Sequence, residues 1–252
     1  MKKEHTNNKN YVLPNLVTIL GLFCGFYSII ATLNGNYVLA ASATLVAFVF
    51  DGIDGRLARM LNATSEFGVQ LDSLADLVSF GVAPAVLVYK WALAPYGRLG
   101  WMAAFLFVAC GALRLARFNV QTKTNDPRFF VGLPIPAAAG VVAASVLFAN
   151  EFVGDPGSIT VPIWFTFTIY VLAFLMVSNI RYFSGKNCMQ QKSYNTLVVF
   201  VLIIFVLGLY PELFLFLLTV GYALSGLLYL AYVRLKHPKK AENTEPIEDI
   251  IS

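Results

Sequence analysis

Apolar residues run in long blocks along most of the chain, and short polar stretches separate the blocks. A helix needs about 20 apolar residues to cross the hydrocarbon core of a bilayer, and several blocks reach that length. A soluble domain buries its apolar residues in one core, and the apolar blocks of this chain are too many and too long for that. The pattern therefore predicts an all-α, polytopic membrane protein.

About eight transmembrane helices are predicted, with both termini on the cytoplasmic side. The predicted spans cover residues 15–33, 36–61, 66–90, 98–120, 134–152, 159–178, 194–210 and 211–233. This topology puts 16 of the 18 lysine and arginine residues on the cytoplasmic side, and it leaves Lys90 and Arg98 outside. Such asymmetry agrees with the positive-inside rule, and a count of six or seven spans would spoil it.

The composition supports the same class of protein, because 58% of residues are hydrophobic and only 13% are charged. Soluble domains have about a quarter of their residues charged. We expect residues 1–240 to form a single transmembrane domain and the acidic tail 241–252 to be disordered. The net charge of +4 follows from the topology and from attraction to anionic lipid, so no nucleic-acid function is expected.

Four aspartates stand out because they lie at the end of the second predicted span and within the third: Asp51, Asp54, Asp72 and Asp76. A carboxylate inside a span costs at least about 2.5–3.5 kcal/mol, so each should face a cavity and have a partner. Residues three or four apart share a helix face, and a short polar linker makes the two helices antiparallel neighbours. We expect two facing tiers of carboxylates, about 10 and 15 Å from the turn on the cytoplasmic side.

Four carboxylates at short range repel one another and need compensation. Ligands that are all oxygen favour Mg²⁺ or Mn²⁺ over zinc. Two such ions would neutralise the cluster and give the clamp that phosphoryl-type displacements use. A salt-bridged helix pair is one alternative. An ion transporter is another, although its site should lie near the bilayer midplane between broken helices.

Small and phosphate-binding residues accompany the aspartates on the same helices. Gly55 and Ala58 follow the first pair at helical spacing, and Gly68 extends the face of the second pair. Their missing side chains would open a slot for a ligand, a feature that a salt-bridged helix pair does not explain. Arg59 and Ser65 offer contacts to a phosphate.

The aspartates belong to a longer motif, Asp51-x-x-Asp54-Gly55-x-x-Ala58-Arg59, then eight residues, then Gly68-x-x-x-Asp72-x-x-x-Asp76. This run resembles the complete motif of the CDP-alcohol phosphotransferase family. The resemblance implies two Mg²⁺ or Mn²⁺ ions held by the four aspartates, with Asp76 also acting as the general base. It implies that the CDP-lipid lies against a set of residues from the first three spans: Asn15, Gly55, Ala58, Arg59, Ser65 and Gly68.

Three further segments, 72–84, 114–119 and 132–137, resemble those of the membrane-embedded phosphatidylserine synthases. The resemblance implies transfer of the phosphatidyl group of CDP-diacylglycerol to the hydroxyl of L-serine, with release of CMP. It also implies a homodimer in a bacterial or archaeal cell membrane, with the active site facing the cytoplasm. Glycerol phosphate, inositol and choline are the alternative acceptors.

Arg114 and Arg117 lie three residues apart at the cytoplasmic end of the fourth predicted span. They could anchor the helix at the membrane surface under the positive-inside rule. Alternatively, one or both could hold a phosphate or the serine carboxylate, for which the planar guanidinium is suited. The sequence leaves both interpretations open.

Overall fold

The computed structural model describes residues 12–61, 65–121, 129–154, 161–183 and 210–236. Within these ranges, five helical segments are long and apolar enough to cross a membrane. The predicted span at 194–210, apart from its last residue, and the predicted tail at 241–252 lie outside the described residues. The total of eight spans and the side on which the termini lie therefore stay predictions.

The first two helices, α1 (Val12–Leu33) and α2 (Tyr37–Met60), form an antiparallel hairpin and match the first two predicted spans. The turn between them uses Gly35, whose φ of 77° suits glycine. Ser28 of α1 donates a hydrogen bond to the backbone oxygen of Ala40 at 2.8 Å, and both residues are fully buried. Small side chains along this face let the helices approach closely.

The chain then continues through α3 (Glu66–Asp76), the π-helical η1 (Leu77–Val82), α4 (Ala83–Val88) and the π-helical η2 (Tyr89–Leu93). A 3₁₀ turn, η3 (Ala94–Tyr96), leads into α5 (Gly97–Gln121), which runs back alongside. Gly97 has φ 54°, a conformation that glycine adopts without strain. The predicted spans 66–90 and 98–120 correspond to the two arms of this helical hairpin.

The η1 segment lies against α1 at a position where both have small residues. Ser79 donates a hydrogen bond to the backbone oxygen of Gly21 at 3.2 Å. A Cβ atom on Gly25 would lie only 2.6 Å from Cα of Ser79. The face of α1 that carries Gly21 and Gly25 is therefore covered by η1 of the same chain. Because Asp76 directly precedes η1, this contact fixes the position of Asp76 along α1.

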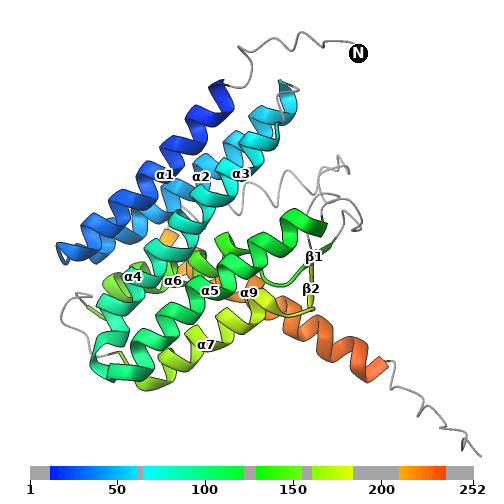
Figure 1. The fold of residues 1–252 in the computed structure, drawn as a ribbon. Coiled ribbons are helices and arrows are strands. Elements are labelled where there is room, and N and C mark those ends of the chain that lie inside the picture. Colours follow the sequence, from blue (N-terminus) through cyan, green and yellow to red (C-terminus); the bar gives the residue numbers. More distant parts are fainter. Residues whose placement is uncertain (1–11, 62–64, 122–128, 155–160, 184–209, 237–252) are drawn as a thin grey trace, which may run out of the picture.

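The remaining elements are β1 (Phe129–Val131), α6 (Ile135–Phe152), α7 (Ile163–Val177), β2 (Arg181–Phe183) and α9 (Pro211–Lys236). Helix α6 packs against both α2 and α9, and every residue from 138 to 146 is buried. Helix α7 packs against α5 (Figure 1). At 15 residues it is shorter than the predicted span 159–178 and shorter than the five candidate spans.

The all-α class is confirmed, and the helices of the described residues are accompanied by a short antiparallel ribbon, in which β1 pairs with β2 with Phe130 opposite Tyr182. Gly132 allows it, because its φ of 79° turns the chain from β1 towards α6. The backbone N–H of Gly132 donates to the oxygen of Ile180 at 2.8 Å, which extends the pairing. Three-residue strands have no hydrophobic alternation long enough to detect in a sequence.

Candidate active site

Helices α2 and α3 carry the four aspartates, and α1 packs against both helices. The start of α1, the end of α2 and the start of α3 lie together at one end of the molecule (Figure 1). Ser65 begins α3 as its N-cap, and its hydroxyl accepts a hydrogen bond from the backbone N–H of Gly68 at 3.0 Å. This cap orients the first turn of α3 and hence the aspartates that follow at helical spacing.

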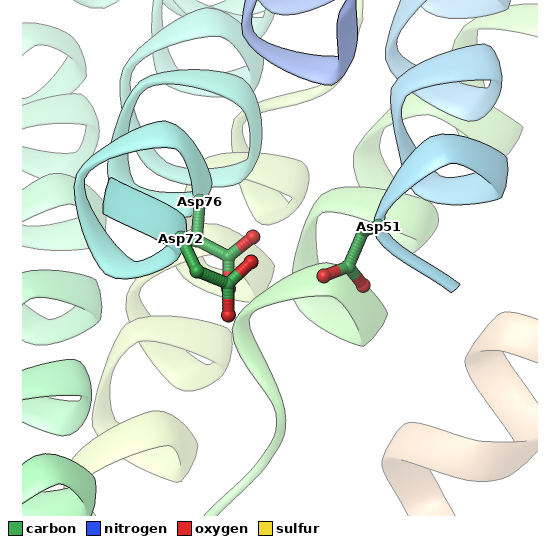
Figure 2. Close-up of side chains that lie close together, drawn as sticks. All are labelled: Asp51, Asp72 and Asp76. Carbon is green, nitrogen blue, oxygen red and sulfur yellow. The ribbon is translucent and has the colours of Figure 1, made fainter. Parts of the chain in front are cut away.

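Three of the four aspartates come together in space. One carboxylate oxygen from each of Asp51, Asp72 and Asp76 lies within 4.8 Å of the others. Figure 2 shows Asp72 and Asp76 side by side on one helix, pointing toward Asp51 on the neighbouring helix. Carboxylates at this separation repel one another strongly unless a cation or a proton lies between them.

Asp54 does not belong to that group of three, because it lies one turn nearer the end of α2. Its side chain is only 5% exposed and lies beside the hydroxyl of Thr18 on α1. That hydroxyl can donate either to Asp54 or to the backbone oxygen of Pro14, which lies 3.2 Å away. The four predicted metal ligands are thus arranged as three clustered carboxylates and a fourth against α1.

A pocket of about 170 Å³ opens between α1, α2 and α3 beside these carboxylates. Its walls include all six residues that the family resemblance puts against the CDP-lipid: Asn15, Gly55, Ala58, Arg59, Ser65 and Gly68. A Cβ atom on Gly68 would lie 3.2 Å from Oγ of Ser65 and 3.3 Å from Oδ1 of Asn15. A side chain at position 68 would therefore obstruct the pocket.

A second, much smaller gap of about 10 Å³ continues from the pocket toward Asp51 and Asp76. Asp54, Asp72 and Thr18 line both spaces, so the two are adjacent. A gap of this volume holds about one water-sized sphere. The acidic cluster and the larger pocket thus form one continuous site.

The donor chemistry of this cluster fits a hard divalent cation. Carboxylate oxygens come from two helices, and neither histidine nor cysteine lines the pocket or the gap. Mg²⁺ and Mn²⁺ prefer such oxygen ligands. The space, the charge and the ligand type therefore agree with the cation class that the sequence predicts.

The two arginines of α5 are placed differently. Arg117 donates to four acceptors at 3.1 or 3.2 Å: the backbone oxygens of Val131, Val177 and Ser178, and Oδ1 of Asn179. Its guanidinium thus ties α5 to the end of α7 and to β1. The sequence could not reveal these partners, because most of them lie about 60 residues away along the chain.

Arg114 lies one turn earlier in α5, closer to the acidic cluster. It is 8% exposed, and its Nε finds no hydrogen-bond partner among the residues that the structure describes. It lies within electrostatic range of Asp76, of Tyr222 on α9 and of Arg117. A buried guanidinium with an unused donor is costly, which makes Arg114 available to an anionic ligand.

Two polar contacts near the site could not be predicted from the sequence. Ser73, next to Asp72, accepts a hydrogen bond from Nδ2 of Asn119 on α5 at 2.9 Å. Tyr222 approaches Arg114 from the C-terminal helix. Spacing along the chain signals neither contact, because both join distant segments.

Helices of membrane-spanning length that enclose an acidic pocket define a helical membrane protein with a candidate site for a hard cation. The family model for CDP-alcohol phosphatidyltransferase matches residues 11–177. The chain therefore belongs to the CDP-alcohol phosphatidyltransferase family, and it is an enzyme of that family. This membership removes the ion-transporter alternative.

Several relatives cover most of the chain. A CDP-diacylglycerol–serine O-phosphatidyltransferase of Helicobacter pylori is 42% identical over 200 residues, which is 79% of this chain and 84% of that protein. The Bacillus subtilis protein of the same name is 36% identical over 69% of this chain and 90% of its own length. An archaetidylserine synthase of Methanothermobacter thermautotrophicus is 36% identical over 68% of this chain and 69% of its own length.

Proposed function

We propose that this enzyme transfers the phosphatidyl group of CDP-diacylglycerol to the hydroxyl of L-serine, giving phosphatidylserine and CMP. The observation that carries the proposal is the continuity of the pocket with the cluster of Asp51, Asp72 and Asp76. The acceptor rests on the similarity to relatives that are named for serine. Glycerol phosphate, inositol and choline remain the alternative acceptors for the assay below.

In this proposal, the CDP portion occupies the pocket between α1, α2 and α3. Arg59 and the hydroxyl of Ser65 contact the diphosphate, since charge-assisted hydrogen bonds to phosphate are strong. Gly55, Ala58 and Gly68 leave the space that the nucleotide needs. Asn15, at the start of α1, lies against the lipid nucleotide, while the acyl chains stay in the bilayer.

Asp51, Asp54, Asp72 and Asp76 would hold two divalent cations, Mg²⁺ or Mn²⁺. When bound, these ions would stabilise the negative charge that develops on the diphosphate and on the departing CMP. Removal of the ions with a chelator should abolish CMP release, and added Mg²⁺ or Mn²⁺ should restore it. Full activity in excess chelator would contradict the cation site.

Asp76 is the proposed general base. It accepts the proton of the serine hydroxyl while the oxygen forms a bond to the phosphorus that carries diacylglycerol. The bond from that phosphorus to CMP breaks, and CMP leaves with the electron pair. Arg114, with its unused buried donor, is the proposed partner of the serine carboxylate. Arg117 already donates its hydrogen bonds within the chain. We therefore propose that Arg117 supports α5 and does not bind a substrate.

The test uses the purified full chain with CDP-diacylglycerol, Mn²⁺ or Mg²⁺, and a panel of alcohols, and it measures CMP release. We expect CMP and phosphatidylserine with serine. CMP release with inositol, glycerol phosphate or choline, and none with serine, would show that the acceptor is that other alcohol. Near-normal turnover by a correctly folded Asp76→Asn variant would exclude Asp76 as the base.

We also propose that the protein is a homodimer in a bacterial or archaeal cell membrane, with its active site at the cytoplasmic face. The count of lysine and arginine residues supports this orientation. The Gly21 and Gly25 face of α1 does not serve as a dimer contact in this proposal, because Phe50 and Ser79 pack against it. Labelling of single cysteines introduced beside Ser65, from either side of sealed vesicles, would report the orientation.

A further inference from the structure

Helix α3 carries Asp72 and Asp76 but buries little of its own surface. Of its 11 residues, all of which the structure describes, Ala75 alone is buried. Phe67 and Leu74 on its outer face are exposed. Helices in a membrane are held together by close packing and by hydrogen bonds between them. Because α3 packs so little, hydrogen bonds gain weight in fixing where its carboxylates lie.

The segments that follow α3 have more neighbours than α3 itself. Both η1 and α4 pack against α1 and against α5, whereas α3 packs against α1. The two arms of the hairpin, α3 and α5, therefore separate beyond η1 (Figure 1). A contact across this separation would decide how far the carboxylates of α3 lie from α5.

A hydrogen bond crosses the separation directly beside Asp72. Nδ2 of Asn119 on α5 donates to Oγ of Ser73 on α3 at 2.9 Å. The hydroxyl of Ser73 in turn donates to the backbone oxygen of Val69 at 3.0 Å. Since its proton is used within α3, Ser73 offers a lone pair to α5, which the NH₂ group of the Asn119 amide meets. The two hydrogen bonds are therefore mutually consistent in direction.

The bond between Ser73 and Asn119 lies about one helical turn from the groups proposed to act on the acceptor. Asp76 follows Ser73 by three residues, so the two share one face of α3. Arg114 precedes Asn119 by five residues on α5. At 1.5 Å per residue, Asp76 lies about 4.5 Å and Arg114 about 7.5 Å nearer the hairpin turn than the bond. The proposed base and the guanidinium thus lie at similar depth on the two helices that the bond joins.

We infer that Ser73 and Asn119 are positioning residues, because their hydrogen bond sets the distance between α3 and α5. That distance places Asp76, the proposed base, relative to Arg114, the proposed partner of the acceptor. The inference rests on the proposed function and deepens it. Neither Ser73 nor Asn119 is among the described residues that line the pocket proposed for the CDP-lipid. Loss of the bond should therefore slow transfer to the acceptor and leave the CDP-lipid unaffected.

The first test compares Ser73→Ala and Ser73→Thr with the unaltered enzyme. Ser73→Ala removes the hydroxyl, and we expect kcat/KM for serine to fall about tenfold, as loss of one hydrogen bond allows. The KM for CDP-diacylglycerol and the thermal midpoint in detergent should change little. Ser73→Thr keeps a hydroxyl at the same position and should retain most of the activity. Rescue by threonine would assign the effect to the hydroxyl group.

A double-mutant cycle with Asn119→Leu tests the partner. Asn119→Leu should also lower kcat/KM for serine. The loss in the combined variant should be smaller than the product of the two single losses, because one bond is removed in each case. Losses that multiply would overturn the inference, and so would equal losses in Ser73→Ala and Ser73→Thr.

Ser42→Ala is the matched control, because Oγ of Ser42 likewise donates four residues back along its own helix, to the backbone oxygen of Val38 at 2.9 Å. It should change neither the kinetics with serine nor the KM for CDP-diacylglycerol. An unchanged kcat/KM for serine in Ser73→Ala would overturn the inference. Equal rises in the KM of both substrates in that variant would do the same.

A distance measurement keeps this inference apart from the proposed function, because it needs no turnover. Spin labels replace Phe67 of α3 and Val120 of α5, which are exposed, in a chain whose native cysteines are changed to alanine. Ser73→Ala should lengthen or broaden the distance between the labels, and Ser42→Ala should not. If no alcohol gives CMP, the proposed function fails, while a changed distance still supports the role of the bond. An unchanged distance would overturn the inference whichever alcohol reacts.

Discussion

The three helices around the acidic site and the buried helix α6 show opposite ways of filling space. Between α1, α2 and α3 the chain leaves a pocket of about 170 Å³ and clusters three carboxylates beside it. In α6 every residue from 138 to 146 is buried, and this stretch carries one polar side chain, Ser145. Ser145 bonds to its own helix, through the backbone oxygen of Val141 at 2.7 Å.

The difference shows where stability and function are separated in this fold. Like charges and unfilled volume both cost stability, so a ligand site needs support from elsewhere. A helix of small, apolar and closely packed residues supplies that support, because it gains dispersion and packing without polar cost. Substitutions in the two regions should therefore have opposite consequences for activity and for stability.

The largest effect should follow Asp72→Asn, which removes one charge from the cluster. Activity should fall by at least about a hundredfold, because the proposed cation would lose a ligand beside the reacting phosphate. The thermal midpoint should not fall, since repulsion among the carboxylates decreases. Glu66→Gln, an exposed change on the same helix, should leave CMP release near normal. Normal turnover in Asp72→Asn would contradict the assignment of activity to the acidic site and of stability to α6.

Gly25→Ala should lower both activity and stability, because Gly25 lies where α1 contacts η1. The added Cβ would lie 2.6 Å from Cα of Ser79, so the helices must separate and Asp76 must shift. We expect a loss of about 1–3 kcal/mol in stability together with reduced activity. Gly21→Ala is the matched control, since its Cβ would lie 3.4 Å from Cβ of Phe50. Equal thermal midpoints in detergent for the two variants would contradict this account.

Ala143→Leu should lower stability and leave the pocket between α1, α2 and α3 unchanged. Ala143 is fully buried in α6, so three extra carbon atoms overpack the core by about 1–3 kcal/mol. The thermal midpoint should fall, while the folded fraction keeps its KM for CDP-diacylglycerol. Ala94→Leu, at an exposed position in the turn before α5, should have little effect on either value. A changed KM in Ala143→Leu would show that α6 acts on the site.

The smallest effects should separate the two arginines of α5. Arg117→Lys loses the planar fork that reaches four acceptors, so stability should fall by about 1 kcal/mol. Arg114→Lys keeps the charge but loses the bidentate geometry, so the KM for the acceptor should rise. Thermal melting and steady-state kinetics of both variants measure the two outcomes. A raised acceptor KM in Arg117→Lys, together with lower stability in Arg114→Lys, would contradict these assignments.

Much of this arrangement follows from local sequence. The helices at Val12–Leu33, Tyr37–Met60 and Ile135–Phe152 end within a few residues of the predicted spans, because apolar length and tight turns define them. The family is also confirmed, since its motif holds every fixed residue within 26 positions. The carboxylates of Asp51 and Asp76 face each other as helix spacing and a short linker require.

Other features depend on contacts between distant segments and leave no local signal. The π-helical turn after Asp76 packs against Gly25 of another helix. The acceptors of Arg117 come from β1 and the end of α7. The separation of Asp54 from the other three aspartates depends on its packing beside Thr18 of α1. Each of these needs the assembled helices, so hydrophobic periodicity and motif spacing could not reveal them.

The walls of the pocket that we propose for the nucleotide come entirely from the segment between Pro14 and Asp72. A ribosome adds about 5–20 residues per second, so Arg114, the proposed partner of the acceptor, is made roughly 2–8 seconds after Asp72. During that interval the growing chain already contains every residue that lines the pocket. Insertion into the membrane can therefore assemble the pocket that we propose for the CDP-lipid before it adds the residue that we propose for the acceptor.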